Sequence, residues 1–199
     1  MKKFKLNNKT IILASHNTGK IAEFKTLFSD YNVKIKTISS LGINEIDETG
    51  KTFEENAIIK VKTVPNGFVG LSDDSGLCIR SLNHAPGIYS ARYAKKNGSW
   101  LKAMEKLYFE TKKTNLFSAI FHCALALKSE DSEISIFKGE VKGKIVWPPK
   151  GNNGFGYDPF FVPSNSNKTF GEMLHMKKIF MDHRFKAFKK MAKFHLTDS

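Results

Sequence analysis

The first third of the chain changes its hydrophobic period twice. The short apolar run 10–14 predicts a buried strand, and the small polar residues 15–19 predict a turn. From Lys20 onward apolar residues recur at helical spacing, and residues 33–37 alternate as they would in a strand. Strand, polar loop, helix and strand make a βαβ unit, which predicts that at least part of the sheet is parallel.

The next helix has a start signal and a stop signal. Thr52 and Glu55 are spaced as a capping box, an apolar stripe from Phe53 to Val64 follows, and Pro65 marks the end. Two strand pieces, 68–71 and 77–79, are then expected on either side of an interruption with the sequence DDSG.

The second half of the chain predicts further strands and helices. Helical spacing covers 100–108, and a long strand is expected over 116–127. Residues 134–137 and 140–146 are expected to form a strand pair that turns at Lys138-Gly139, and a basic helix is expected over about 184–194. The stretch 147–169, rich in Gly, Pro and Asn, predicts a long loop, and long loops in compact domains tend to be functional.

Composition adds limits to this pattern. With 199 residues, of which 41% are hydrophobic, the chain over residues 1–199 is long enough for one domain of ordinary size or for one domain with two lobes. The formal net charge of +13 favours anionic partners, although a solvated basic surface explains the spread of the lysines equally well. Cys78 and Cys123 lie in apolar runs, which predicts buried free thiols. The apolar run 11–14 is too short for a signal sequence or membrane span, so a cytoplasmic protein is expected.

Two segments have the residue types of a phosphate and metal site. ASHNTGKIAEF, residues 14–24, lies between a strand end and a helix start, where free N–H groups, the helix dipole and Lys20 favour an anion. Asp73 and Asp74 are paired carboxylates that suit Mg²⁺ binding and water activation, and Asp47 with Glu48 is a second acidic pair. An ordinary polar turn explains the first segment as well. An Asp-rich turn with caps explains Asp73 and Asp74, and a solvated acidic turn or a bias at the helix start explains Asp47 and Glu48.

Two further segments suggest contact with a nucleoside. The run 151–159, GNNGFGYDP, combines glycines for close approach with rings for stacking, although its aromatic residues could equally pack into the core. In KIFMDHR, residues 178–184, a cationic group near a helix start is not what the dipole prefers, which raises the chance of ligand contact; a structural histidine is the alternative. The four segments together indicate a nucleotide-processing site better than a polymer-binding surface.

The order of these motifs resembles the Ham1/inosine triphosphatase family over about residues 11–191. The matching segments are ASHNTGKIAEF, ETGKTFEENAIIK, LSDDSGLCI with APGIYSARYA, FHCALAL, GNNGFGYDPFFVP, and KTFGEM followed by KKIFMDHR. The resemblance implies an α/β fold with an elongated, long, mixed, twisted sheet, flanking helices and two lobes around a central nucleotide cleft. It also implies a homodimer that cleaves ITP, dITP and XTP to the monophosphate and pyrophosphate with Mg²⁺.

The same resemblance implies roles for individual residues. Asp74 is the expected catalytic residue and a metal ligand, and the acidic residue upstream of the ETG motif, Asp47 or Glu48, is the expected second ligand. The residues implied in substrate binding are Ser15, His16, Asn17, Thr18, Gly19 and Lys20 for the phosphates, Ser75, then Phe155, Gly156, Tyr157 and Asp158 for the nucleoside, and Lys178, His183 and Arg184 for the base.

One residue departs from the family pattern. The last motif of the family has Ser-His-Arg, whereas this chain has Asp182-His183-Arg184. An ionised aspartate only accepts hydrogen bonds, so Asp182 would alter base selection if it faced the pocket, or would cap the final helix if it faced outward. A related nucleotide pyrophosphatase with another base preference therefore stays open. A basic nucleic-acid-binding protein is the competing class, but it draws on net charge alone.

Overall fold

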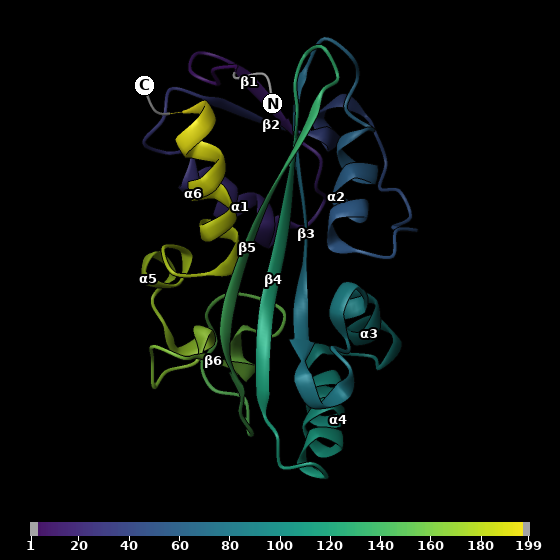
Figure 1. Cartoon of the computed structure of the whole chain (residues 1–199), viewed down its shortest axis with the longest axis vertical. Helices are drawn as coiled ribbons and strands as arrows, with labels where there is room; N and C mark the ends of the chain where they lie inside the picture. The colour runs from purple at the N-terminus through teal and green to yellow at the C-terminus, as the bar shows by residue number, and fades with distance from the viewer. Residues whose placement is uncertain (1–3, 197–199) are drawn as a thin grey trace. The chain divides into compact units, whose positions relative to one another are not determined.

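The computed structural model describes residues 4–196 and shows a mixed α/β fold (Figure 1). Its strands and α-helices follow one another as β1 (Thr10–Leu13), α1 (Thr18–Leu27), β2 (Lys34–Thr37), α2 (Phe53–Val61), β3 (Val69–Ile79), α3 (Ser90–Lys96), α4 (Trp100–Lys112), β4 (Ser118–Lys128), β5 (Ile134–Ile145), β6 (Phe161–Pro163), α5 (His175–Ile179) and α6 (His183–His195). Short 3₁₀ turns lie between several of these elements.

The strands form one six-stranded sheet in the order β2-β1-β3-β4-β5-β6. Strand β1 pairs in parallel with both β2 and β3, so that Ile12 lies opposite Lys36 on one side and Gly70 on the other. Strand β5 pairs with β6 in the antiparallel sense, which makes the sheet mixed. The predicted α/β class, the βαβ unit and the mixed sheet are therefore confirmed.

The chain divides into two compact units. Unit 1 contains the chain up to Asp74, Cys123–Gly139, and the chain from Arg184 onward, whereas unit 2 contains Ser75–His122 and Glu140–His183. Strands β3, β4 and β5 each contribute residues to both units. The description of the chain as one domain with two lobes around a cleft stays a prediction.

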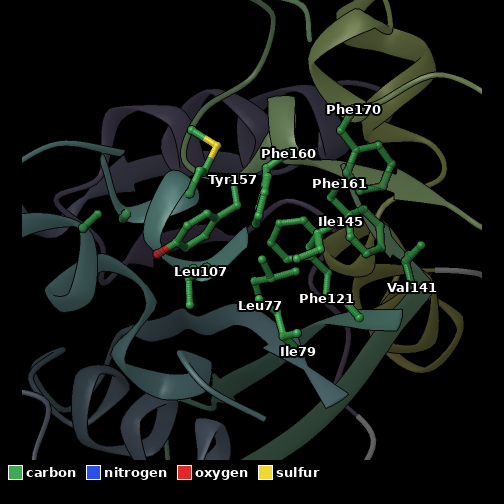
Figure 2. Packing of buried hydrophobic residues seen from close by; sticks show 14 of the residues in the cluster. Leu77, Ile79, Leu107, Phe121, Val141, Ile145, Tyr157, Phe160, Phe161 and Phe170 are labelled. Carbon is green, nitrogen blue, oxygen red and sulfur yellow. The ribbon is translucent and has the colours of Figure 1, made fainter. Parts of the chain in front are cut away.

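Each unit has its own apolar core. In unit 2 the ring centroids of Phe121 and Phe161 are 4.8 Å apart and those of Phe161 and Phe170 are 5.4 Å apart, and Figure 2 shows these rings beside Val141 and Ile145. The described part of unit 1 includes a small cluster around β1 and another where α2 meets β4; their buried members are Ile12, Ala14, Ile38 and Val64, and Ala57, Val61, Ala124 and Ala126.

Two strands are longer than the sequence predicts. The expected interruption at DDSG is wrong, because β3 runs without a break from Val69 to Ile79. The expected turn at Lys138-Gly139 is also wrong, because both residues lie within β5, Ile134–Ile145. Polar residues suggested a break in each case. In β3 the charged side chains are instead buried against partners of opposite charge.

At position 76 of β3 the packing leaves room only for a glycine. A Cβ atom at this position would lie 2.2 Å from the carbonyl oxygen of Gly87 and 2.6 Å from Oγ of Ser90. The Ser90 hydroxyl accepts a hydrogen bond from the N–H of Leu77 at 3.0 Å. The glycine thus permits close packing of the segment that leads into α3, rather than a turn.

The predicted helix starts are mostly confirmed. Helix α2 begins after Thr52, whose hydroxyl accepts from the N–H of Glu55 at 3.1 Å, although the Glu55 carboxylate binds the N–H of Lys51. The last helix, α6, covers the predicted range within one residue at each end.

Cys78 and Cys123 are buried free thiols, as predicted. Within residues 4–196, no helix has the length and apolar character needed to cross a membrane.

Candidate active site

The loop between β1 and α1 has the predicted strand–turn–helix geometry. Three buried residues end β1, and Asn17 then caps α1 by accepting the N–H of Lys20 at 3.0 Å. Ser15 is buried and accepts from the N–H of Asn17, while Nε2 of His16 lies 3.0 Å from the carbonyl oxygen of Ile43. Asn17 and Thr18 are exposed at the first turn of the helix, and His16, Gly19 and Lys20 are half-buried. The arrangement leaves the start of α1 accessible to an anion.

Asp73 is the centre of a buried ion-pair cluster in unit 1. Its Oδ2 lies 3.0 Å from Nζ of Lys20 and 3.0 Å from Nη2 of Arg184, and the Arg184 Nη1 also binds Glu23. Burial alone would raise the pKa of Asp73, but Lys20, Arg184 and Lys60 together hold it well below its ordinary value. Asp73 is therefore a permanent anion that holds Lys20 and Arg184 in place.

Asp74 has a different environment. Its Oδ2 accepts from Nδ2 of Asn56 at 3.0 Å, and its Oδ1 lies 3.4 Å from Nζ of Lys60. Burial raises the pKa of Asp74, and the negative charge of Glu48 adds to this effect, against the opposing charges of Lys60 and Lys20. A carboxylate with a raised pKa is a better proton acceptor than its neighbour with a depressed one. The two adjacent aspartates thus differ in role: Asp73 is suited to structure and Asp74 to chemistry.

Two residues of this cluster, Asn56 and Lys60, were not predicted. Both lie on α2; Asn56 is fully buried, and its Oδ1 accepts from the N–H of Gly50 at 2.8 Å. Burial alone would lower the pKa of Lys60, but the carboxylates around it raise it. Asn56 and Lys60 lie three and seven residues after Phe53, on the same helix face as the apolar stripe. Polar residues on a face that is expected to be buried often belong to a functional site, and this was the signal in the sequence that could have identified them.

The residues suit a magnesium ion only in part. The Nζ atom of Lys60 lies 2.5 Å from Oε1 of Glu48 and 3.4 Å from Oδ1 of Asp74, so two carboxylates approach one positive charge. Asp47 is exposed in the loop before α2. Within the described part of the chain, no group of three or more His, Cys, Asp or Glu side chains is arranged for a metal. Because Mg²⁺ commonly takes one or two carboxylates together with phosphate oxygens, Glu48 and Asp74 fit this ion when a phosphate is present.

The glycine-rich loop of unit 2 is built around Asp158. Its Oδ2 accepts from the N–H of Phe155 at 2.9 Å, and a Cβ at Gly154, where φ is +75°, would lie 2.1 Å from that same oxygen. Phe155 and Gly156 are half-buried. Tyr157 is buried, packs edge-on against Trp100, and belongs to the core of unit 2. For Tyr157 the structure thus favours core packing over ligand stacking.

The predicted base-binding residues are all buried, and each has an identified partner. Nζ of Lys178 lies 3.4 Å from Oδ2 of Asp158 and 3.0 Å from Oδ2 of Asp182. The ring of His183 stacks on Phe121 with centroids 4.7 Å apart. Arg184 lies in the unit 1 cluster, bound by two carboxylates. Ser75 is half-buried in β3, next to Asp74. Contact of these side chains with a substrate stays a prediction.

Comparison with known proteins places this geometry in a family. The model of the Ham1 family matches residues 11–194. A dITP/XTP pyrophosphatase of Zymomonas mobilis is 42% identical over 96% of this chain and 93% of its own length, and one of Prochlorococcus marinus (strain NATL1A) is 44% identical over 92% of each. The solved Ham1 protein of Coxiella burnetii has a TM-score of 0.84 at 37% identity and covers 93% of this chain, and 97% of its own chain is covered. The chain belongs to the Ham1 family.

Proposed function

We propose that this protein hydrolyses noncanonical purine nucleoside triphosphates, namely ITP, dITP and XTP, to the nucleoside monophosphate and pyrophosphate. The single observation that supports this most is the buried cluster around Asp73 and Asp74, because it combines fixed cations with a carboxylate of raised pKa. The printed names of the curated relatives, dITP/XTP pyrophosphatase, agree with this substrate class.

The phosphates are assigned to unit 1. Lys20 and the exposed N–H groups at the start of α1 bind phosphate oxygens, while Asp73 and Asn17 fix the position of that lysine and that helix start. Lys60 places a second positive charge beside Asp74, where negative charge develops during phosphoryl transfer. Mg²⁺ held by Asp74 and Glu48, when bound, supplies further neutralisation of the phosphate charge.

Asp74 is assigned as the general base. It takes a proton from a water molecule whose oxygen forms a bond to one of the two phosphorus atoms flanking the α–β bridging oxygen. The bond from that phosphorus to the bridging oxygen breaks, and the bridging oxygen keeps the electron pair. The products are the nucleoside monophosphate and pyrophosphate. Asn56, which donates to Oδ2 of Asp74, orients the carboxylate for this step.

The base is assigned to unit 2. Phe155 is half-buried in the glycine-rich loop, and Lys178 lies 5.3 Å from the centre of its ring. A ring for stacking beside a buried polar cluster is a common way to recognise a base edge. The wrong base leaves buried polar groups of such a site without hydrogen-bond partners. The free-energy cost of these unpaired groups disfavours the wrong base relative to the correct one.

The experiment is a measurement of pyrophosphate release from ITP, XTP, dUTP, ATP and GTP with Mg²⁺ present. We expect the highest kcat/KM for ITP and XTP. Equal turnover of dUTP would favour a related pyrophosphatase with another base preference. A salt-sensitive gel shift with nucleic acid and no hydrolysis of any triphosphate would favour the competing class, a basic nucleic-acid-binding protein.

A further inference from the structure

Lys128, the last residue of β4, has a side chain that is buried in unit 1. The residue is 2% exposed, and its Nζ atom lies 2.6 Å from the carbonyl oxygen of Val64, 3.1 Å from that of Pro65 and 3.4 Å from Oδ1 of Asn66. These three acceptors are uncharged. A protonated lysine has three N–H donors, one for each of these oxygens, so the ammonium form matches the site.

The two carbonyl groups that Lys128 binds belong to the turn that ends helix α2. The last residue of this helix is Val61, and the N–H of Val64 donates to the Val61 carbonyl at 3.2 Å. A cation at the C-terminal end of a helix interacts favourably with the helix dipole and with the last carbonyl groups. Lys128 therefore fastens the end of α2 to β4.

The end of α2 also lies directly against β3. A Cβ atom at Gly70 would lie 3.0 Å from Cγ2 of Val64 and 3.1 Å from Cγ2 of Val61. Gly70 is on the strand that carries Asp74, four residues before it. The position of the helix end is thus set by β4 on one side and by β3 on the other.

Lys60, in the last turn of α2, reaches the Asp74 carboxylate only at the limit of hydrogen-bond distance. Its Nζ atom lies 3.4 Å from Oδ1 of Asp74 but 2.5 Å from Oε1 of Glu48. A small shift of the helix end away from β3 would break the longer contact first. Lys60 would then lie closer to Glu48 and farther from the carboxylate at which the chemistry is assigned.

We propose that Lys128 is a positioning residue for the hydrolysis, because it fixes the end of α2 and thereby holds Lys60 beside Asp74. This inference rests on the proposed function, in which Lys60 stabilises negative charge that develops during phosphoryl transfer. Lys128 acts through α2 and Lys60, and it is not a catalytic residue. The loss of an interaction that matters only as charge develops lowers kcat and leaves KM nearly unchanged.

The test measures hydrolysis of ITP by the unsubstituted enzyme, by Lys128→Met and by Lys128→Gln. Methionine keeps an apolar stem and donates no hydrogen bond, whereas glutamine keeps two donors. We expect kcat to fall about tenfold in Lys128→Met and by a smaller factor in Lys128→Gln, with KM within about twofold of the parent value. The glutamine variant decides the question if the methionine variant does not fold.

Lys9→Met is the matched control. Nζ of Lys9 lies 2.7 Å from Oε2 of Glu130, which is in the turn that follows Lys128, so this variant also removes an ammonium group that holds that turn. It leaves the carbonyl groups of Val64 and Pro65 bound to Lys128. The kcat of Lys9→Met for ITP should therefore stay within about twofold of the parent value.

A double substitution separates positioning from a general loss of stability. Lys60→Met alone should lower kcat, and the addition of Lys128→Met should lower it by less than about twofold more, because no Lys60 ammonium remains to be positioned. A smaller fraction of folded enzyme would instead lower kcat by the same factor in both backgrounds.

Amide hydrogen exchange follows the end of the helix without any substrate. The N–H groups of Lys62, Thr63 and Val64 donate to carbonyl groups in the last turn of α2. Their exchange should be faster in Lys128→Met than in the unsubstituted protein and unchanged in Lys9→Met.

Three results would overturn the inference. They are a kcat within twofold of the parent value in both Lys128 variants, an equally large fall in kcat when Lys60 is already methionine, and unchanged exchange at the end of α2. If the unsubstituted protein hydrolyses no triphosphate, the proposed function fails and this inference fails with it. Hydrolysis of ITP with an unchanged kcat in both Lys128 variants defeats this inference alone.

Discussion

Adjacent aspartates on one strand point to opposite faces, and here the two faces have different electrostatics. Asp73 is surrounded by Lys20 and Arg184, so its pKa is depressed, while the pKa of Asp74 is raised by burial in spite of Lys60. Repulsion between neighbouring carboxylates is therefore relieved by fixed cations on both sides. The result is a division of roles, with Asp73 suited to structure and Asp74 to chemistry, that two adjacent aspartates in a sequence do not reveal by themselves.

Substitution of Asp74 by asparagine tests the chemical half of that division. The amide keeps the shape of the side chain and the hydrogen bond from Asn56, but it cannot take a proton from water. We expect kcat for ITP to fall by about 10²- to 10⁴-fold, the range that a general base contributes, with little change in melting temperature. Near-normal turnover by a folded Asp74→Asn protein would remove Asp74 from the mechanism.

Substitution of Glu23 tests the structural half. Glu23 is buried and binds Arg184, which is itself bound to Asp73. Removal of one partner from a buried ion pair leaves charge uncompensated, so Glu23→Gln should lower the free energy of unfolding by about 3 kcal/mol. Urea unfolding measures this loss, and Glu45→Gln, at an exposed loop position, is the control. A loss below about 1 kcal/mol would show that the cluster contributes little to stability.

Among the elements, α2 has the most direct influence on the site. It begins at a hydroxyl cap from Thr52 and packs an apolar face of Ala57 and Val61 into unit 1. The same face carries Asn56 and Lys60 to the Asp74 carboxylate. The helix therefore couples packing in unit 1 to the position of two polar side chains.

Removal of the Thr52 cap is expected to lower the stability of the protein by a defined amount. Thr52→Ala leaves the N–H of Glu55 without its side-chain acceptor, and the free energy of unfolding should fall by about 1 kcal/mol. Thr52→Ser restores the acceptor and should recover most of the loss. Thr26→Ala within α1 is the control, because its hydroxyl bonds back to the Ala22 carbonyl and alanine is the better helix former. Equal losses in Thr52→Ser and Thr52→Ala would contradict the capping role.

Elements with a strong local signal could be predicted, and those set by tertiary contacts could not. The βαβ start, the Thr52 cap and the range of α6 follow from period and capping chemistry. The continuity of β3 could not be predicted, because the charges that seemed to break it are neutralised by Lys20 and Arg184, and Arg184 is 111 residues away from Asp73. For Tyr157 the sequence leaves ligand stacking and core packing equally open, and only its contact with Trp100, 57 residues away, decides for the core of unit 2.

At the scale of the whole molecule, the beginning and the end of the described chain meet in unit 1. The N–H of Leu6 donates to the carbonyl of His195 at 2.9 Å, and Nδ1 of His195 lies 2.8 Å from the carbonyl oxygen of Phe4. Because a carbonyl only accepts, Nδ1 carries the hydrogen in the neutral ring. Nε2 is buried with no hydrogen-bond partner among the described residues. The neutral histidine thus joins α6 to the segment before β1.

This contact predicts that stability falls in mild acid. Burial lowers the pKa of His195, the nearby Lys5 lowers it further, and the hydrogen bond to Phe4 opposes them only in part. The unfolded chain, whose histidine has a pKa of about 6.5, therefore takes up the proton first as the pH falls. The stabilisation is complete above that pH and is lost as the pH falls from there toward the folded value.

Urea unfolding at pH 7.5 and at pH 5.5 measures this loss, and His195→Asn identifies its source. The asparagine amide still donates to Phe4 but does not titrate, so the fall in unfolding free energy between the two pH values should be smaller in the variant. The variant also loses ring contacts with Phe4 and Phe137. This loss lowers the free energy of unfolding by the same amount at both pH values, so it cancels when the two values are subtracted. His84→Asn, at an exposed position whose φ of 64° asparagine tolerates, should keep the fall of the parent protein. If His195→Asn loses as much stability in acid as the parent does, another group is the source of the pH dependence.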